Sequence, residues 1–359
     1  MKHAFIFLIA TIFHTYAFGQ EETKSSPFTI NGYIETYYSY DFNQPEHNTR
    51  PGFVYAYNRH NEVNLNLGFI RGSYQTDNVR ANLALMAGTY ANANLAAEPG
   101  VLKNIYEANV GIKLSSSKNL WVDAGIFASH IGFESAIGKD CWNLTRSILA
   151  DNTPYYEAGA KISYTSENGK WFLSGLILNG WQRIQRVDGN SLPSFGTQIT
   201  FKPNDRITLN SSSFIGTDKP DSSRQMRYFH NFYGIFQVSG KVGLTVGFDY
   251  GAEEKSPETT GTNVWISPVV IAKFTINDKL SIGMRAEYYE DENGVIIATG
   301  TPNGFKTTGV SANFDYLVLP NAIWRVEVRN FASKDNVFQK DDGASKTDTF
   351  VTTALALSF

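Results

Sequence analysis

The side-chain pattern repeats every two residues along most of the chain. Between Val242 and Tyr250 every even-numbered residue is apolar and every odd-numbered residue is polar or glycine. The segments around 79–88, 104–115 and 279–290 alternate in a similar way. Successive side chains of a β-strand point to opposite faces, so alternation over about eight residues indicates strands with one apolar face. The expected fold class is all-β.

About sixteen such segments follow one another, and the connections between them alternate in length. Short turns, such as the one at Asn277-Asp278, alternate along the chain with long polar loops, such as 132–155. This order is typical of a transmembrane antiparallel β-barrel, with short periplasmic turns and long extracellular loops. The expected strands centre on 28–40, 60–74, 78–90, 104–115, 120–131, 156–166, 170–180, 193–203, 206–217, 226–238, 241–251, 263–275, 279–290, 306–316, 321–331 and 347–359.

A closed barrel also satisfies the backbone in a membrane. Lipid offers no hydrogen-bond partner, so every N–H and C=O must pair within the protein. Tilted strands of about 9–11 residues cross the hydrocarbon layer. A soluble β-sandwich or β-helix is the alternative, but its loops need not alternate in length. Aromatic residues near the expected strand ends suit interfacial girdles: Tyr37, Tyr38, Tyr40, Tyr155, Tyr156, Trp171, Trp181, Tyr250, Tyr288 and Trp324.

One residue conflicts with the strand pattern. Pro268 lies inside the expected strand 263–275, where it cannot donate a hydrogen bond to the neighbouring strand. A bulge, or a strand end nearer than the pattern indicates, would accommodate it.

The two ends of the chain carry export signals. A basic start, an apolar run to Phe18 and small residues at Ala17 and Gly19 predict a signal peptide over residues 1–19. We expect residues 20–27 to form a short periplasmic segment and residues 28–359 to form the barrel. The last strand alternates and ends on Phe359. Bacterial outer-membrane barrels commonly close on such a strand, so the barrel-assembly machinery and outer-membrane lipid are expected partners.

Composition argues against several other classes of protein. The chain has one cysteine, Cys141, which rules out an internal disulfide framework and a cysteine-based metal site. Its net charge of -3 argues against nucleic-acid binding. No metal or cofactor is expected, because only six histidines occur and two precede residue 20.

An enzyme and a plugged transporter are also disfavoured. Ser129 and His130 are adjacent, so on a strand they would point to opposite faces, and His230 has no partner that the sequence identifies. A plugged transporter needs an N-terminal plug domain and about 22 strands. We therefore expect no enzymatic activity.

The chain resembles the β-barrel porins of the OmpL-like type, which occur mostly in Gram-negative bacteria of the Bacteroidota. The resemblance runs through nearly the whole mature chain, and the order of its motifs carries it. It implies a porin with no established catalytic residue and with poorly defined substrates. The motifs are NGYIETYYSY at 31–40, WVDAGIF at 121–127, SHIGFES at 129–135, TRS at 145–147, PYY at 154–156, NGWQR at 179–183, and RAEYYED at 285–291 with Gly294.

Alternation assigns nine basic and eight acidic side chains to the lumen, so no strong ion selectivity is expected. In Arg285-Ala286-Glu287 and Arg325-Val326-Glu327 the charged residues are two apart and share a face. They could set a transverse field at a constriction, or they could simply be wall ion pairs, which we favour. The pore-lining candidates are Glu35, Arg80, Glu107, Lys113, Asp123, Lys161, Lys202, Arg227, Asp249, Arg285, Glu287, Arg325, Glu327 and Arg329, with Glu62, Lys273 and Asp315 on the same face.

Loop 132–155 is the longest connection and the best candidate for a constriction. We expect it to fold into the lumen with Glu134, Asp140 and Arg146 around the narrowest point. A surface loop packed on its neighbours is the alternative.

The sequence therefore predicts an outer-membrane porin for passive diffusion of small hydrophilic solutes or ions. A barrel of about sixteen strands is wide enough for a water-filled channel. The rival is a closed structural or adhesive barrel whose long loops bind partners. Many porins are trimers. The sequence leaves open whether this chain forms a homotrimer, because no residues identify a face that would pack against a neighbour.

Overall fold

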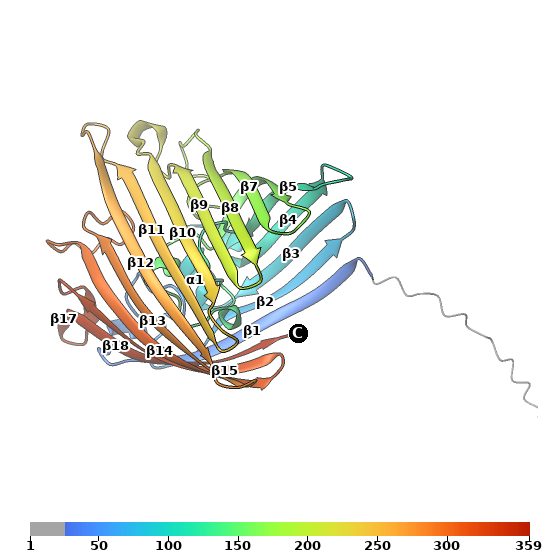
Figure 1. Cartoon of the computed structure of the whole chain (residues 1–359). Helices are drawn as coiled ribbons and strands as arrows, with labels where there is room; N and C mark the ends of the chain where they lie inside the picture. Colours follow the sequence, from blue (N-terminus) through green and yellow to red (C-terminus); the bar gives the residue numbers. More distant parts are fainter. Residues whose placement is uncertain (1–25) are drawn as a thin grey trace, which may run out of the picture.

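The computed structural model describes residues 26–359, and sixteen strands in this part of the chain close into one antiparallel barrel (Figure 1). β1 (Phe28–Asp41) pairs with β2 (Val63–Gln75) on one side and with β18 (Thr347–Ser358) on the other, which closes the cylinder. The other barrel strands are β3 (Val79–Ala87), β4 (Ile105–Lys113), β5 (Asn119–Ala128), β6 (Tyr156–Thr165), β7 (Trp171–Leu178), β8 (Ser194–Asn204), β9 (Ile207–Gly216), β10 (Arg227–Gln237), β11 (Val242–Glu254), β12 (Thr262–Thr275), β13 (Leu280–Asp291), β14 (Phe305–Leu319) and β15 (Ala322–Ser333). The predicted barrel is confirmed, while the expected signal peptide lies outside the described residues.

The connections alternate in length as predicted. Turns such as 205–206 and 320–321 lie at the end of the barrel where β1 begins and β18 ends. We call this the turn end and the opposite end the loop end. None of the helices within residues 26–359 is long and apolar enough to cross a membrane. The loops hold short elements that alternation did not predict: η1 (Glu46–Asn48), α1 (Thr89–Asn94), η2 (Gly100–Asn104), η3 (Gly138–Asp140), α2 (Ile148–Asp151), η4 (Asp221–Ser223), and the hairpin β16 (Phe338–Lys340) and β17 (Gly343–Ser345).

The alternation sorts side chains between the two sides of the wall. On β14 the side chains of Val310 and Phe314 are exposed on the outside, while those of Thr307, Asn313 and Asp315 are buried inside. Outward positions thus carry the apolar band that suits lipid, and inward positions carry polar groups.

Only some of the aromatic residues predicted for the interfacial girdles are exposed on the outside of the barrel. Trp171, Tyr250 and Trp324 are exposed, as girdle residues would be. Tyr37 and Tyr156, by contrast, are buried, so their assignment to a girdle is wrong. Closeness to a strand end does not say which side of the wall a ring faces. Trp181 and Tyr155 are also misassigned, because they pack on Phe214 and Tyr90 respectively.

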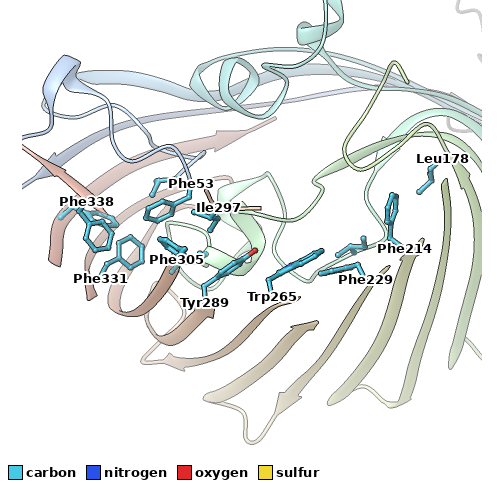
Figure 2. Close-up of a cluster of buried hydrophobic side chains, with 14 of the residues drawn as sticks. Phe53, Leu178, Phe214, Phe229, Trp265, Tyr289, Ile297, Phe305, Phe331 and Phe338 are labelled. Carbon is cyan, nitrogen blue, oxygen red and sulfur yellow. The ribbon is translucent and has the colours of Figure 1, made fainter. Parts of the chain in front are cut away.

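Near the loop end, bulky residues from several strands point inward and are buried (Figure 2). Loops 42–62, 292–304 and 334–346 fold onto these residues, so part of the barrel interior is packed like a hydrophobic core. The strand residues are Phe214, Phe229, Trp265, Tyr289, Phe305, Phe331 and Phe350, and the loop residues are Phe53, Ile297 and Phe338.

Pro268 sits in the middle of β12, without the bulge or early strand end that the sequence suggested. The pairs 267 with 289 and 268 with 288 are missing from the ladder between β12 and β13, but the register is the same on both sides of the gap. The hydroxyl of Ser267 donates to the carbonyl oxygen of Tyr288 at 3.0 Å. It supplies the donor that proline lacks.

We expect Ser267→Ala to lower the free energy of unfolding by about 1–3 kcal/mol, because it leaves the Tyr288 carbonyl without a donor. In a Pro268→Val background the backbone N–H of residue 268 would replace that donor, so the same change should cost clearly less. Urea unfolding of the four variants in lipid vesicles measures both costs. Equal costs in the two backgrounds would contradict this interpretation.

Candidate functional site

The connection between β5 and β6, residues 129–155, lies inside the barrel, and we call it the lumen loop. The backbone N–H of Gly132 donates to Asn231 on β10 at 3.3 Å. The backbone N–H of Leu144 donates to Asn313 on β14 at 3.1 Å. The loop therefore leaves β5 and reaches the wall on the far side of the lumen before it returns to β6.

Inward-facing glycines seat the lumen loop against the wall. The rings of Trp142 and Phe133 lie over Gly243 and Gly247 of β11, where an added Cβ would come within 2.6 Å of a ring atom in each case. At Gly283 of β13 an added Cβ would lie 2.5 Å from the carbonyl oxygen of Trp142. The sequence shows these glycines on the inward face but not the loop that needs them.

Four charged residues of β13 and β15 form a buried ion-pair network. Arg285 pairs with Glu287 at 3.2 Å and with Glu327 at 2.8 Å, and Arg329 pairs with Glu287 at 2.5 Å. Exposure of these residues does not exceed 6%. The sequence placed all four on the inward face, and the structure brings them together beneath the lumen loop.

This network also holds the lumen loop. The backbone N–H and the hydroxyl of Thr145 donate to Glu327 at 2.6 and 2.9 Å. Arg285 donates to the Thr145 carbonyl, Arg329 to the Arg146 carbonyl, and the Ile148 N–H donates to Glu287, each at 2.7 Å. We call these four residues and their loop contacts the loop clamp.

A second ion pair holds the preceding part of the loop. Arg325 is bound by Asp315 at 2.5 Å and donates to the carbonyl oxygens of Gly138 at 2.7 Å and Cys141 at 3.0 Å. Each loop carbonyl thus receives a charged donor, which is stronger than a neutral one.

Two further pore-lining candidates, Glu35 and Asp249, are buried. Glu35 on β1 accepts from the hydroxyl of Tyr57 at 2.9 Å, and Asp249 on β11 accepts from Asn231 at 2.5 Å. Both carboxylates face inward as predicted, but neither reaches water.

The three constriction candidates have different surroundings. Arg146 is buried and donates to three carbonyls of its own loop, those of Ser135, Leu144 and Ala136. Glu134 accepts from the backbone N–H and hydroxyl of Ser147. Of the three, only the Asp140 side chain is substantially open to water, at 48% exposure, and it pairs with Lys139 at 2.9 Å.

The remaining candidates line cavities or lie near the turn end of the barrel. A cavity of about 400 Å³, which we call the turn-side cavity, lies inside β2–β7 and includes Arg80, Glu107, Asp123 and Lys161 in its lining. Lys113 and Lys202 face inward near the turn end, on β4 and β8.

A second cavity of about 400 Å³ lies at the loop end, and we call it the loop-side cavity. It is lined by Asp151 of the lumen loop and by Trp181, Asp218 and Arg227 of the neighbouring connections and strands. Arg227 pairs with Glu253 at 2.6 Å. The predicted lumen residues therefore fall into two sets, one beside water and one beneath the loop.

His130 was not a site candidate in the sequence, but it anchors the start of the lumen loop. Its ring nitrogens lie 2.8 Å from Glu157 of β6 and 2.8 Å from the carbonyl oxygen of Ser213 on β9. Within residues 26–359 no cluster of three His, Cys, Asp or Glu residues is arranged to hold a metal ion.

Asp151 is a buried acid at the end of α2. Burial raises the pKa of its carboxyl to about 7, although Arg329 and Arg146 oppose this shift. The hydroxyl of Tyr155 donates to it at 3.2 Å. Ionisation of Asp151 near neutral pH therefore works against the packing of the lumen loop.

A family model described as "Putative beta-barrel porin-2, OmpL-like" matches residues 27–359. A comparison with curated proteins gives no match.

Solved structures of similar fold include three porin-like barrels. The anion-selective porin from Comamonas acidovorans is 10% identical with a TM-score of 0.61, over 92% of this chain and 99% of that chain. The trimer form of the Vibrio cholerae outer membrane protein OmpT is 9% identical with a TM-score of 0.55, over 92% and 99%. Salmonella typhi OmpF in complex with daunomycin is 10% identical with a TM-score of 0.58, over 92% and 97%. At these identities the likeness concerns the fold alone.

We expect Glu327→Ala to loosen the lumen loop, because it leaves Arg285 short of a buried counter-charge. Breaking such a pair typically costs about 3–5 kcal/mol. Cys141, the single cysteine, is buried in the loop and serves as a reporter. Its reaction with a maleimide in the refolded barrel should accelerate. Glu258→Ala, in the exposed loop 255–261, is the matched control and should leave the rate unchanged.

We expect the packing of the lumen loop to weaken as the pH rises from about 4 to 7. The folded pKa of Asp151, about 7, lies above its ordinary value of 3.8, so the stability given by its protonated form is lost across that interval. The ratio of Cys141 labelling rates in the wild type and Asp151→Asn cancels the titration of the thiol. This ratio should rise up to pH 7 and then level off, whereas a constant ratio would contradict the assignment.

Proposed function

The chain belongs to the OmpL-like β-barrel porin-2 family and is an outer-membrane channel for passive diffusion, and from this premise we propose the route that solutes take. The route runs along the inner face of β2–β8, from the loop-side cavity past the lumen loop to the turn-side cavity. One observation carries the proposal: charged inward side chains remain accessible to water on this wall, whereas those beneath the lumen loop are buried. Arg80 and Glu107 keep 29% and 19% of their side chains exposed, whereas Arg285 and Glu327 keep none.

The lumen loop is the proposed constriction. A sixteen-stranded barrel is wide enough for an aqueous channel, but the loop fills the half beside β11–β15. The two ion-pair groups that hold the loop are buried, so the narrowing is a fixed part of the channel. The solutes are therefore small hydrophilic molecules and ions.

Burial changes the charge that a solute meets. The inward charges are nearly balanced in the sequence, but the covered set contains more acids than bases: Glu35, Asp249, Glu287, Asp315 and Glu327 against Arg285, Arg325 and Arg329. The charges left beside water on β3–β8 are the basic Arg80, Lys113, Lys161 and Lys202 against the acidic Glu107, while Asp123 is buried against Arg80. We propose a preference for anions, which is also the selectivity by which the Comamonas acidovorans porin is described.

Assembly as a homotrimer and insertion through the barrel-assembly machinery are part of this proposal. The trimer form of the Vibrio cholerae protein supports the first, and the alternating apolar pattern of the C-terminal strand β18 supports the second.

Replacing residues 136–150 by a short Gly-Ser linker should raise single-channel conductance roughly twofold or more, because it removes the element that narrows the lumen. Refolded protein in planar bilayers with KCl gradients measures conductance and, from the reversal potential, anion preference. The same linker in place of the exposed loop residues 256–260 is the control and should change nothing.

Unchanged conductance after removal of residues 136–150 would overturn the constriction. A folded wild-type barrel that never conducts would favour the closed structural or adhesive barrel.

A further inference from the structure

The geometry points to a binding site for small hydroxylated carboxylates in the turn-side cavity, built around Lys161 and Arg80. The inference rests on the proposed function, because the cavity lies on the proposed route. A volume of about 400 Å³ is within the range of small-molecule sites, roughly 300–1,000 Å³.

Lys161 is a cation with no carboxylate partner among the described residues. It points inward from β6, and its ammonium lies 4.7 Å from the ring centroid of Phe127. None of the ion pairs formed within residues 26–359 includes it, although Arg80 next to it does form one. The ammonium is therefore available to an anion that enters from the lumen.

Arg80 is held in a fixed orientation that leaves one nitrogen free. Its Nε and one terminal nitrogen donate to Asp123 at 2.6 and 2.5 Å, and its guanidinium lies 4.3 Å from the ring centroid of Trp121. No described residue accepts a hydrogen bond from the other terminal nitrogen. Asp123 neutralises one of the two cations, so a single excess positive charge remains between Arg80 and Lys161. One carboxylate group balances it.

Apart from the aromatic rings of Trp121, Phe127 and Phe172, the rest of the lining is polar and suits hydroxyl groups. The amide of Asn82 donates to Asn109 at 3.1 Å and accepts from Ser73 at 2.8 Å, which fixes its position. Gln75, Ser163 and Thr165 also line the cavity. A ligand whose carbon chain carries many hydroxyl groups finds hydrogen-bond donors and acceptors here, whereas an apolar carboxylic acid would leave these groups without partners.

The neighbouring ion pair of Arg71 and Glu107 adds no net charge to the cavity. Arg71 pairs with Glu107 at 3.1 Å and stacks 5.2 Å from the ring centroid of Phe69, so it is neutralised and already packed. Lys113 faces the lumen near the turn end but does not line the turn-side cavity. The excess positive charge within the cavity is thus specific to Lys161.

Gluconate and sorbitol test the inference, because they share a six-carbon hydroxylated chain and differ in the carboxylate. We expect gluconate to bind the detergent-solubilised wild-type barrel saturably in isothermal titration calorimetry, and sorbitol not to bind. Lys161→Gln should weaken gluconate binding about tenfold, as expected for a lost charge-assisted hydrogen bond. Lys161→Arg keeps the cation and should retain binding, which guards against misfolding of the first variant.

Lys113→Gln is the matched control, since it removes the same charge from the lumen outside the cavity. If it weakens binding as much as Lys161→Gln does, the effect is the general field of the lumen and the inference is overturned. Absence of saturable gluconate binding to the wild type overturns it as well, whether or not the barrel conducts. Binding by a barrel that never conducts in bilayers supports the site but overturns the proposed function.

Discussion

Antiparallel pairing of β1 with β18 is the constraint on which the structure depends. It leaves no free strand edge, so every barrel strand has hydrogen-bonded neighbours on both sides, as a wall in contact with lipid requires. Closure also fixes which side chains share an interior. Residues as distant in sequence as Glu35 and Arg325 then face one lumen, although the chain separates them by most of its length.

The interior is filled unevenly, and this asymmetry follows from the chemistry of the wall. Strands β11 and β13 carry inward glycines that leave room for Trp142 and Phe133, and β13 and β15 carry the loop clamp. Buried ion pairs hold position only when their remaining hydrogen-bonding groups are satisfied, and here loop backbone groups supply the partners. The lumen loop and this wall are therefore complementary. The space proposed for water and solutes lies on the opposite side of the lumen, beside β2–β8.

Burial also decides what the charges do. The same side-chain types hold the loop on one wall and meet solutes on the other. The inward charges are nearly balanced in number, but more of the acids than of the bases are buried. A surplus of basic groups therefore remains beside water. Both the proposed anion preference and the proposed carboxylate site depend on this division.

Alternation by itself determined the strands, their even number, the order of turns and loops, and which face of each strand points inward, because a two-residue period is a local property of the backbone. It also placed Arg285, Glu287 and Lys161 on the lumen side. Only the tertiary structure decided that the first two are buried and the third is open to water, because burial depends on where the loop from 129 to 155 lies. That position is set by contacts with strands up to about two hundred residues away, such as those of Thr145 with Glu327, which no local pattern encodes.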